Sequence, residues 1–327
     1  MAESYRDRAI VVKRHDLGEA DRIIVLFTRD HGIVRAVAKG VRRAKSRFGS
    51  RLAPFVETDV QIHPGRNLGT ITGADTIRTW AAPIVDDYAR YTCACGVLET
   101  AERLAGEEGA PSPGLWDLTV DALDALAHSA TAADVAATAA DVAATDAADT
   151  DAAGTADERG PENGVHRGST LGGHNGGAPR RTPGLLLTAY LLKAMGEAGW
   201  APSLFDCAQC GKPGPHKAFA PAAGGAVCVE CRPPGAATPP TDVLRLMWWL
   251  AHDRWDYIHA VSDRRGFRPL AAQARGLATA HLHHHLGRRV AALSFVDARW
   301  GEDGSPRTST TPTARTHPGA PGRGTPS

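Results

Sequence analysis

The 327-residue sequence has little net charge, few aromatic side chains and no long apolar run. Its formal charge is only +1, and its apolar fraction of 43% is that of a globular protein. No apolar stretch is long enough to cross a bilayer, and residues 1–7 lack the apolar segment of a secretory signal. We therefore expect a cytoplasmic protein with no membrane partner, in which cysteines stay reduced.

The motifs of common enzyme classes are also missing. The sequence contains no phosphate-binding loop, no nucleophile elbow and no pair of carboxylates spaced for acid–base catalysis. We therefore expect no catalytic residues and no enzymatic activity. A hydrolase with a site hidden in the second half of the chain is an alternative, and metal-dependent nuclease activity would distinguish it.

Four of the six cysteines form two closely spaced pairs. Two residues separate Cys207 from Cys210 and Cys228 from Cys231, and 17 residues lie between the pairs. This spacing is typical of a structural zinc site, in which four thiolates complete a tetrahedron and leave no position for water or substrate. Disulfide pairs and free thiols are the alternatives. We expect Zn²⁺ that stabilises the fold rather than catalyses a reaction.

The first 80 residues read as short strands separated by turn signals. The expected strands cover residues 8–14, 21–28, 32–38, 55–63 and 68–74. Because no long helix lies between them, the pattern predicts a small five-stranded closed barrel of the OB type. An SH3-like barrel is the structural alternative.

From Pro83 onward the apolar period becomes helical. The expected helices start after Asp86 or Asp87, near Leu115, at Gly184, after Thr241 or Asp242, and near Leu270.

The whole chain is therefore expected to be a multi-domain α+β protein. The barrel occupies residues 1–80, and an α-helical domain with an inserted four-cysteine zinc loop at 205–233 occupies residues 81–300. Two low-complexity segments are expected to be a disordered insertion at 129–182 and a disordered tail at 301–327.

Basic residues concentrate in the expected barrel. Residues 1–80 carry 15 Lys and Arg against 9 Asp and Glu, and the stretch from Arg35 to Arg51 contains no acid. Glycines and serines in this stretch predict a loop that presents charge and backbone N–H groups, a combination that suits phosphates. A solvated basic surface is the alternative.

Several short motifs follow one another along the chain. Gly18-Glu19-Ala20-Asp21-Arg22 comes first, then Ala38-Lys39-Gly40-Val41-Arg42 and Lys45-Ser46-Arg47-Phe48. Gly199-Trp200-Ala201-Pro202 precedes the four cysteines. With these motifs the chain resembles the bacterial recombination mediator RecO.

The resemblance covers residues 6–128 and 183–296, and the insertion between them departs from the family's compact pattern. It implies an OB fold, a helical domain and a zinc-binding loop. It also implies a non-enzymatic role in DNA repair at the nucleoid: binding single- and double-stranded DNA, annealing complementary strands, and helping to load RecA onto DNA coated by single-strand-binding protein.

The partners that the resemblance implies are RecR and the acidic C-terminal tail of single-strand-binding protein. The alternative function is a zinc-stabilised OB-fold protein that binds RNA or associates with transcription. Competition between single-stranded DNA and RNA would separate the two functions.

Nucleic acids bind an OB barrel on strands 2 and 3 and on the loops between strands 1–2 and 4–5. The residues expected to contact DNA are Arg14, Arg22, Arg35, Lys39, Arg42, Arg43, Lys45, Arg47 and Arg66. Few aromatic residues accompany them: Phe27 and Phe55 are expected in the core, and Phe48 either packs there or stacks on a base. We therefore expect little sequence preference.

Two polar clusters near the C-terminal end of the last expected helix are expected to have structural rather than ligand-binding roles. His281, His284 and His285 share a helical face, but no carboxylate accompanies them at metalloprotease spacing, so we expect partners of the helix end rather than a metal site. Arg288 and Arg289 are expected to be solvated, with additional DNA contacts as the alternative.

Overall fold

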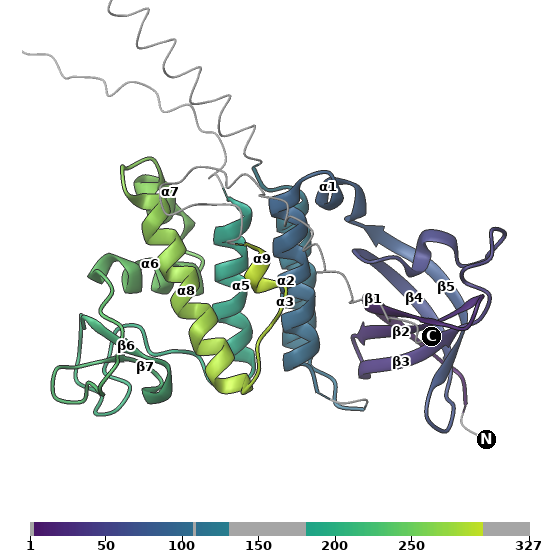
Figure 1. Cartoon of the computed structure of the whole chain (residues 1–327), viewed down its shortest axis with the longest axis horizontal. Coiled ribbons are helices and arrows are strands. Elements are labelled where there is room, and N and C mark those ends of the chain that lie inside the picture. The colour runs from purple at the N-terminus through teal and green to yellow at the C-terminus, as the bar shows by residue number, and fades with distance from the viewer. Residues whose placement is uncertain (1–2, 107–108, 131–180, 297–327) are drawn as a thin grey trace, which may run out of the picture.

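The computed structural model describes residues 3–106, 109–130 and 181–296. A β-barrel lies at one end of the molecule, a helical bundle in the middle, and a loop with the small β6–β7 sheet at the other end (Figure 1). The expected tail at 301–327 and residues 131–180 of the expected insertion lie outside the described residues.

Five strands close into a barrel in the order β1-β2-β3-β5-β4, which is the order of an OB fold. Their bounds are β1 Tyr5–Leu17, β2 Asp21–Thr28, β3 Gly32–Ala38, β4 Val56–His63 and β5 Gly69–Thr79. The first half of β1 pairs with β4 and the second half with β2, with an irregularity between Val11 and Lys13. The expected OB-type barrel is confirmed, although β1 and β5 are longer than predicted.

The second half of strand β2 is buried on both faces. Alternate side chains point to opposite faces of a strand. Ile24 and Leu26 of β2 fill the barrel, whereas Val25 and Phe27 of the same strand belong to the core of the helical bundle. The Phe27 ring meets the Trp116 ring edge-on at 5.4 Å. Helices therefore cover part of the outer face that an OB fold uses for nucleic acid.

The helical part contains eight described helices. They are α1 Ala81–Val85, α2 Tyr88–Leu104, α3 Pro113–Ala127, α5 Pro183–Glu197, α6 Thr241–Ala251, α7 Trp255–Ser262, α8 Phe267–Leu286 and α9 Leu293–Val296. Helix α5 is central and contacts α2, α3, α6 and α8. In the described part of the chain, no helix combines the length and apolar character needed to cross a membrane.

Helix starts follow the predicted capping in one case and differ in another. Asp87 caps α2 and accepts a hydrogen bond from the Arg90 N–H at 2.8 Å, as expected. Helix α6 begins at Thr241 itself, its N-cap is Pro240, and no side chain caps it. The predicted cap at Thr241 or Asp242 is therefore wrong. Pro240 fixes the backbone at this boundary without a side-chain acceptor.

A buried histidine joins α8 to the segment that leads into the cysteine loop. His281 is fully buried, and its Nε2 donates to the Trp200 carbonyl oxygen at 3.1 Å. Its ring also lies 5.9 Å from the Phe219 ring. Burial lowers the pKa of His281 to about 4, because the charged imidazolium would lose its hydration.

Acid should destabilise the protein through His281. Its pKa is depressed in the folded state, so its contribution to stability is complete above pH 6.5 and is lost as the pH falls toward 4. Between pH 7.5 and 5.0 this loss is about 2 kcal/mol. The His281→Gln variant keeps a side-chain N–H donor that does not titrate. Its free energy of unfolding should fall by about 2 kcal/mol less than that of the unmodified protein over the same pH range. Urea unfolding of both proteins at the two pH values measures the difference; equal losses would contradict the assignment.

Candidate nucleic-acid interface and metal centre

The loop after β3, residues 39–47, is called the basic loop below. Gly40 adopts a φ of 68°, which suits a residue without a Cβ, and its N–H donates to Asp21 Oδ1 at 2.7 Å. The Arg42 N–H donates to the Ala20 carbonyl at 3.0 Å, and the Ser46 N–H donates to the Arg43 carbonyl at 2.9 Å. The first two bonds anchor the basic loop beside the β1–β2 turn, and the third closes a turn within the loop.

Four cations of the basic loop have no acidic partner. They are Lys39, Arg43, Lys45 and Arg47. All four are exposed, and among the described residues none of them forms an ion pair. The Arg47 guanidinium lies 4.9 Å from the centre of the Phe48 ring, a contact that leaves its N–H donors available. These four side chains are free to bind phosphate oxygens.

Two other predicted contacts, Arg22 and Arg42, are already engaged by Asp16. The Asp16 carboxylate lies 2.8 Å from Arg22 Nε and 3.5 Å from Arg42 Nη1, and Arg42 also donates to the Gly18 carbonyl at 3.0 Å. The hydrogen bond from Arg22 lowers the pKa of Asp16. Arg22 and Arg42 thus hold the β1–β2 turn against the basic loop.

The remaining predicted contacts lie around the barrel. Arg14 is exposed and close to Arg22; burial and then the Arg22 charge lower its pKa. Arg66 is exposed in the β4–β5 turn, near the pairing of β5 with β3. Arg35 is exposed on β3 and lines a depression beside α2.

The three phenylalanines of the barrel are buried. Phe48 is only 2% exposed and belongs to the barrel core, so of the two alternatives for this residue core packing is confirmed. Phe27 and Phe55 are buried as expected. An exposed ring beside Arg14 was missed in the sequence: Tyr91 of α2 is 43% exposed, packs edge-on against Phe55, and interacts with the charge of Arg14. It was missed because it lies outside the barrel sequence.

Three arginines elsewhere on the barrel pair with acids. Arg6 pairs with Asp59 at 3.1 Å, and the buried Glu57 pairs with both Arg8 and Arg78. Among the described residues, Arg29 and Arg51 also form no ion pair, so the basic loop holds the densest but not the whole unpaired positive charge of the barrel.

The four paired cysteines converge at the far end of the molecule from the barrel. The sulfur atoms of Cys207, Cys210, Cys228 and Cys231 all lie within 4.8 Å of one another. The Cys210 and Cys228 sulfurs are 3.8 Å apart, which excludes a disulfide and matches the spacing of about 3.8 Å between thiolates around a tetrahedral metal. Among the described residues, no other group of three or more His, Cys, Asp or Glu converges in this way.

The local backbone favours the ionised form of one of the four thiols, Cys207. Gly211 has a φ of 71° and donates its N–H to the Cys207 carbonyl at 2.9 Å, which closes the first turn. The Cys228 N–H donates to the Cys207 sulfur and lowers the pKa of that thiol to about 6. Hydrogen bonds to Cys228 and then Cys210 raise the pKa of Cys231 to about 12. All four sulfurs can ionise together only beside a cation, so this donor set fits a metal ion.

Family comparisons match both parts of the chain. The family model described as "Recombination protein O N terminal" matches residues 1–80, and "Recombination protein O C terminal" matches residues 85–145 and 175–294. The chain belongs to the recombination protein O family. It is therefore a DNA-binding protein of recombination and repair, and the resemblance noted in the sequence is confirmed.

The two family models divide the molecule of this recombination protein O family member into two parts. The OB barrel with the basic loop is the family's N-terminal domain, and the cysteine cluster lies within the C-terminal match. The gap in that match, residues 146–174, falls inside the insertion that departs from the family pattern in the sequence.

Proposed function

We propose that the protein is a non-enzymatic recombination mediator that anneals complementary DNA strands and helps to load RecA onto single-stranded DNA coated by single-strand-binding protein. The observation that carries the proposal is the set of four exposed, unpaired cations on the basic loop of an OB barrel. Family membership supports the DNA-binding part of this role.

Annealing requires charge neutralisation rather than bond chemistry. Two DNA backbones repel each other, and a basic surface that binds both removes much of this barrier and raises the encounter rate. Because Phe48 is buried, the basic loop offers no base-stacking ring of its own. Contacts to the backbone dominate, so the protein would act at any sequence.

The nine residues proposed for DNA binding fall into three groups. Lys39, Arg43, Lys45 and Arg47 contact phosphates directly, and Arg14, Arg35 and Arg66 extend this surface around the barrel. Arg22 and Arg42 act through Asp16 by positioning the β1–β2 turn against the basic loop.

We further propose that the ion held by Cys207, Cys210, Cys228 and Cys231 is Zn²⁺. Zinc bound by four thiolates supplies a cross-link and no open coordination position. The loop has a small core of its own, in which two of the five buried residues are cysteines. The ion would therefore stabilise this loop against the bundle and take no part in DNA binding.

The proposed partners are single- and double-stranded DNA, RecR and the C-terminal tail of single-strand-binding protein, with RecA as an indirect partner. These partners and a location at the bacterial nucleoid in the cytoplasm rest on family membership.

The test is annealing of complementary oligonucleotides that are first coated with the cognate single-strand-binding protein, without ATP. The protein should accelerate duplex formation well above the rate of the coated strands alone. The matched control is the same reaction with RNA oligonucleotides as competitors. No acceleration on coated DNA, or full inhibition by RNA at equal concentration, would contradict the proposal.

A further inference from the structure

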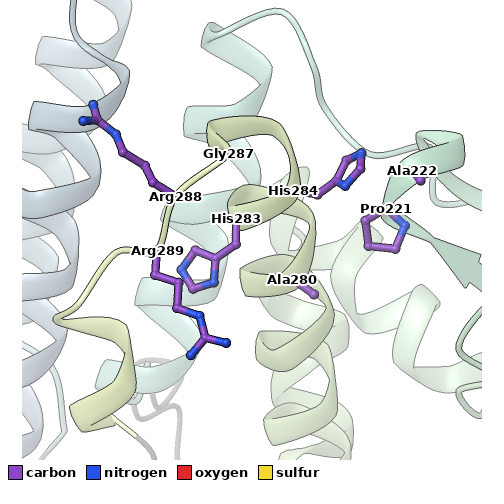
Figure 2. A pocket seen from close by; sticks show the side chains of 8 residues that line it. All are labelled: Pro221, Ala222, Ala280, His283, His284, Gly287, Arg288 and Arg289. Carbon is purple, nitrogen blue, oxygen red and sulfur yellow. The ribbon is translucent and has the colours of Figure 1, made fainter.

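Two adjoining depressions run from the barrel across the end of the helical bundle and share Arg288. The first, of about 540 Å³, is lined by Arg35 of β3, Glu102 and Arg103 of α2, and Arg288. The second, of about 450 Å³, is lined by His283, His284, Arg288 and Arg289 (Figure 2). Together they are called the arginine groove below.

The arginine groove carries a net positive charge. Its one acidic lining residue, Glu102, is only 13% exposed and pairs with Lys13 at 2.6 Å. Arg35, Arg288 and Arg289 form no ion pair within the described ranges of the chain. These three cations therefore remain available to an anionic partner.

The backbone that presents Arg288 and Arg289 is fixed in place. Gly287 ends α8 with a φ of 64°, and the Val290 N–H donates to His283 Nε2 at 3.0 Å. Glu99 of α2 then accepts the N–H groups of the next two residues, at 3.1 and 2.8 Å. Figure 2 shows Arg288 extending toward the neighbouring helix, and Glu102 and Arg103 of α2 line the depression there. The arginine pair is thus attached to α2, the helix that also packs on the barrel.

The groove lies close to the basic loop along the chain. Arg35 lies four residues before Lys39 on the strand that leads into the loop, so at most about 13 Å of backbone separates them. The cations come from three elements in succession rather than converging on one point. This arrangement suits an extended polyanion better than a single carboxylate.

We propose that the arginine groove binds the continuation of the DNA strand held by the basic loop, with Arg35 at the junction and Arg288 and Arg289 on the next segment of backbone. The inference rests on the proposed DNA-binding role of the barrel and extends the DNA path onto the helical domain. Arginines at the C-terminal end of a helix also stabilise its dipole, so the test must separate DNA contact from stability.

The test compares oligonucleotides of about 8 and about 30 nucleotides, because one OB fold covers about 4–16 nucleotides. Arg288→Gln with Arg289→Gln should leave affinity for the short strand within about twofold. Affinity for the long strand should fall about tenfold. The slope of log affinity against log salt concentration should become shallower by about 1.4 for this strand. The matched control, Arg264→Gln with Arg265→Gln, alters another exposed arginine pair and should change neither.

Fluorescence anisotropy measures both affinities, and urea unfolding checks the fold. If the double variant is unstable, Arg35→Gln serves as the second variant. It should lose more affinity for the long strand than for the short one. Equal losses at both lengths, or none, would overturn the groove assignment while leaving the basic loop intact. Binding of an aspartate-rich peptide provides a second check. The assignment also fails if the double variant binds this peptide more weakly than the unmodified protein does but binds the long DNA strand equally well. A wild-type protein that binds neither length contradicts the proposed function itself.

Discussion

Replacing Arg43, Lys45 and Arg47 together by glutamate should reduce DNA affinity about 100-fold or more while leaving the barrel folded. The three side chains are exposed and form no ion pair in the described structure, so their replacement breaks no salt bridge and removes only the contact of Arg47 with the Phe48 ring. The change converts three positive charges into three negative ones that repel phosphates. If all three contact phosphates, their loss also reduces the salt slope for single strands by about 2. Anisotropy at low salt measures the affinity.

The matched control reverses three arginines far from the barrel in sequence, Arg264, Arg265 and Arg268. They are exposed near the start of α8, and the variant has the same net charge as the loop variant. It should retain most of the DNA affinity. Arg42 is left unchanged in both variants, because its contacts with Asp16 and Gly18 make it part of the turn. Similar affinities for the loop variant and the control would show that net charge, not the basic loop, governs binding.

Removing the proposed metal ion should produce the largest loss of stability. Chelation, or Cys207→Ala, leaves a loop with few buried apolar residues and sulfurs that no cation neutralises. Loss of a structural metal at a site of this kind is expected to cost about 3 kcal/mol or more, which lowers the melting temperature of a domain of this size by about 10 °C. Thermal unfolding with and without chelator, together with metal analysis of the purified protein, measures the effect.

Cys95 provides the matched control for that experiment. It lies on α2, outside the cluster, and burial raises the pKa of its thiol. The Cys95→Ala protein should still contain metal, and chelator should still lower its melting temperature. The Cys207→Ala protein should show neither property. An unchanged melting temperature after complete removal of the metal would show that the four cysteines do not stabilise the fold.

The barrel was largely predictable because local signals coincide with its strands. Strands β2 and β3 match the predicted ranges, since apolar runs there end at clear turn residues. Strand β1 continues past the predicted end, because its irregularity after Val11 interrupts the alternation and its last residues are exposed. Helices α1, α7 and α9, of 5, 8 and 4 residues, are too short to show a helical period.

The site was predictable as a set of charges but not as a set of contacts. The cysteine spacing implied a cluster before any geometry was known, because two residues between thiols set their separation locally. The pairing of Arg42 with Asp16 depends on how two loops pack, which no local pattern specifies. The same holds for Arg35 and Arg288, which come from opposite ends of the chain and meet only across α2.

The salt dependence of DNA binding by the unmodified protein tests the central claim most directly. Affinity for a mixed-sequence single strand should fall as salt rises, with a log–log slope of about −0.7 for each neutralised phosphate. The four free cations of the basic loop alone would give a slope of about −3. Binding that does not respond to salt, or no binding even in dilute buffer, would contradict a surface that binds the phosphate backbone.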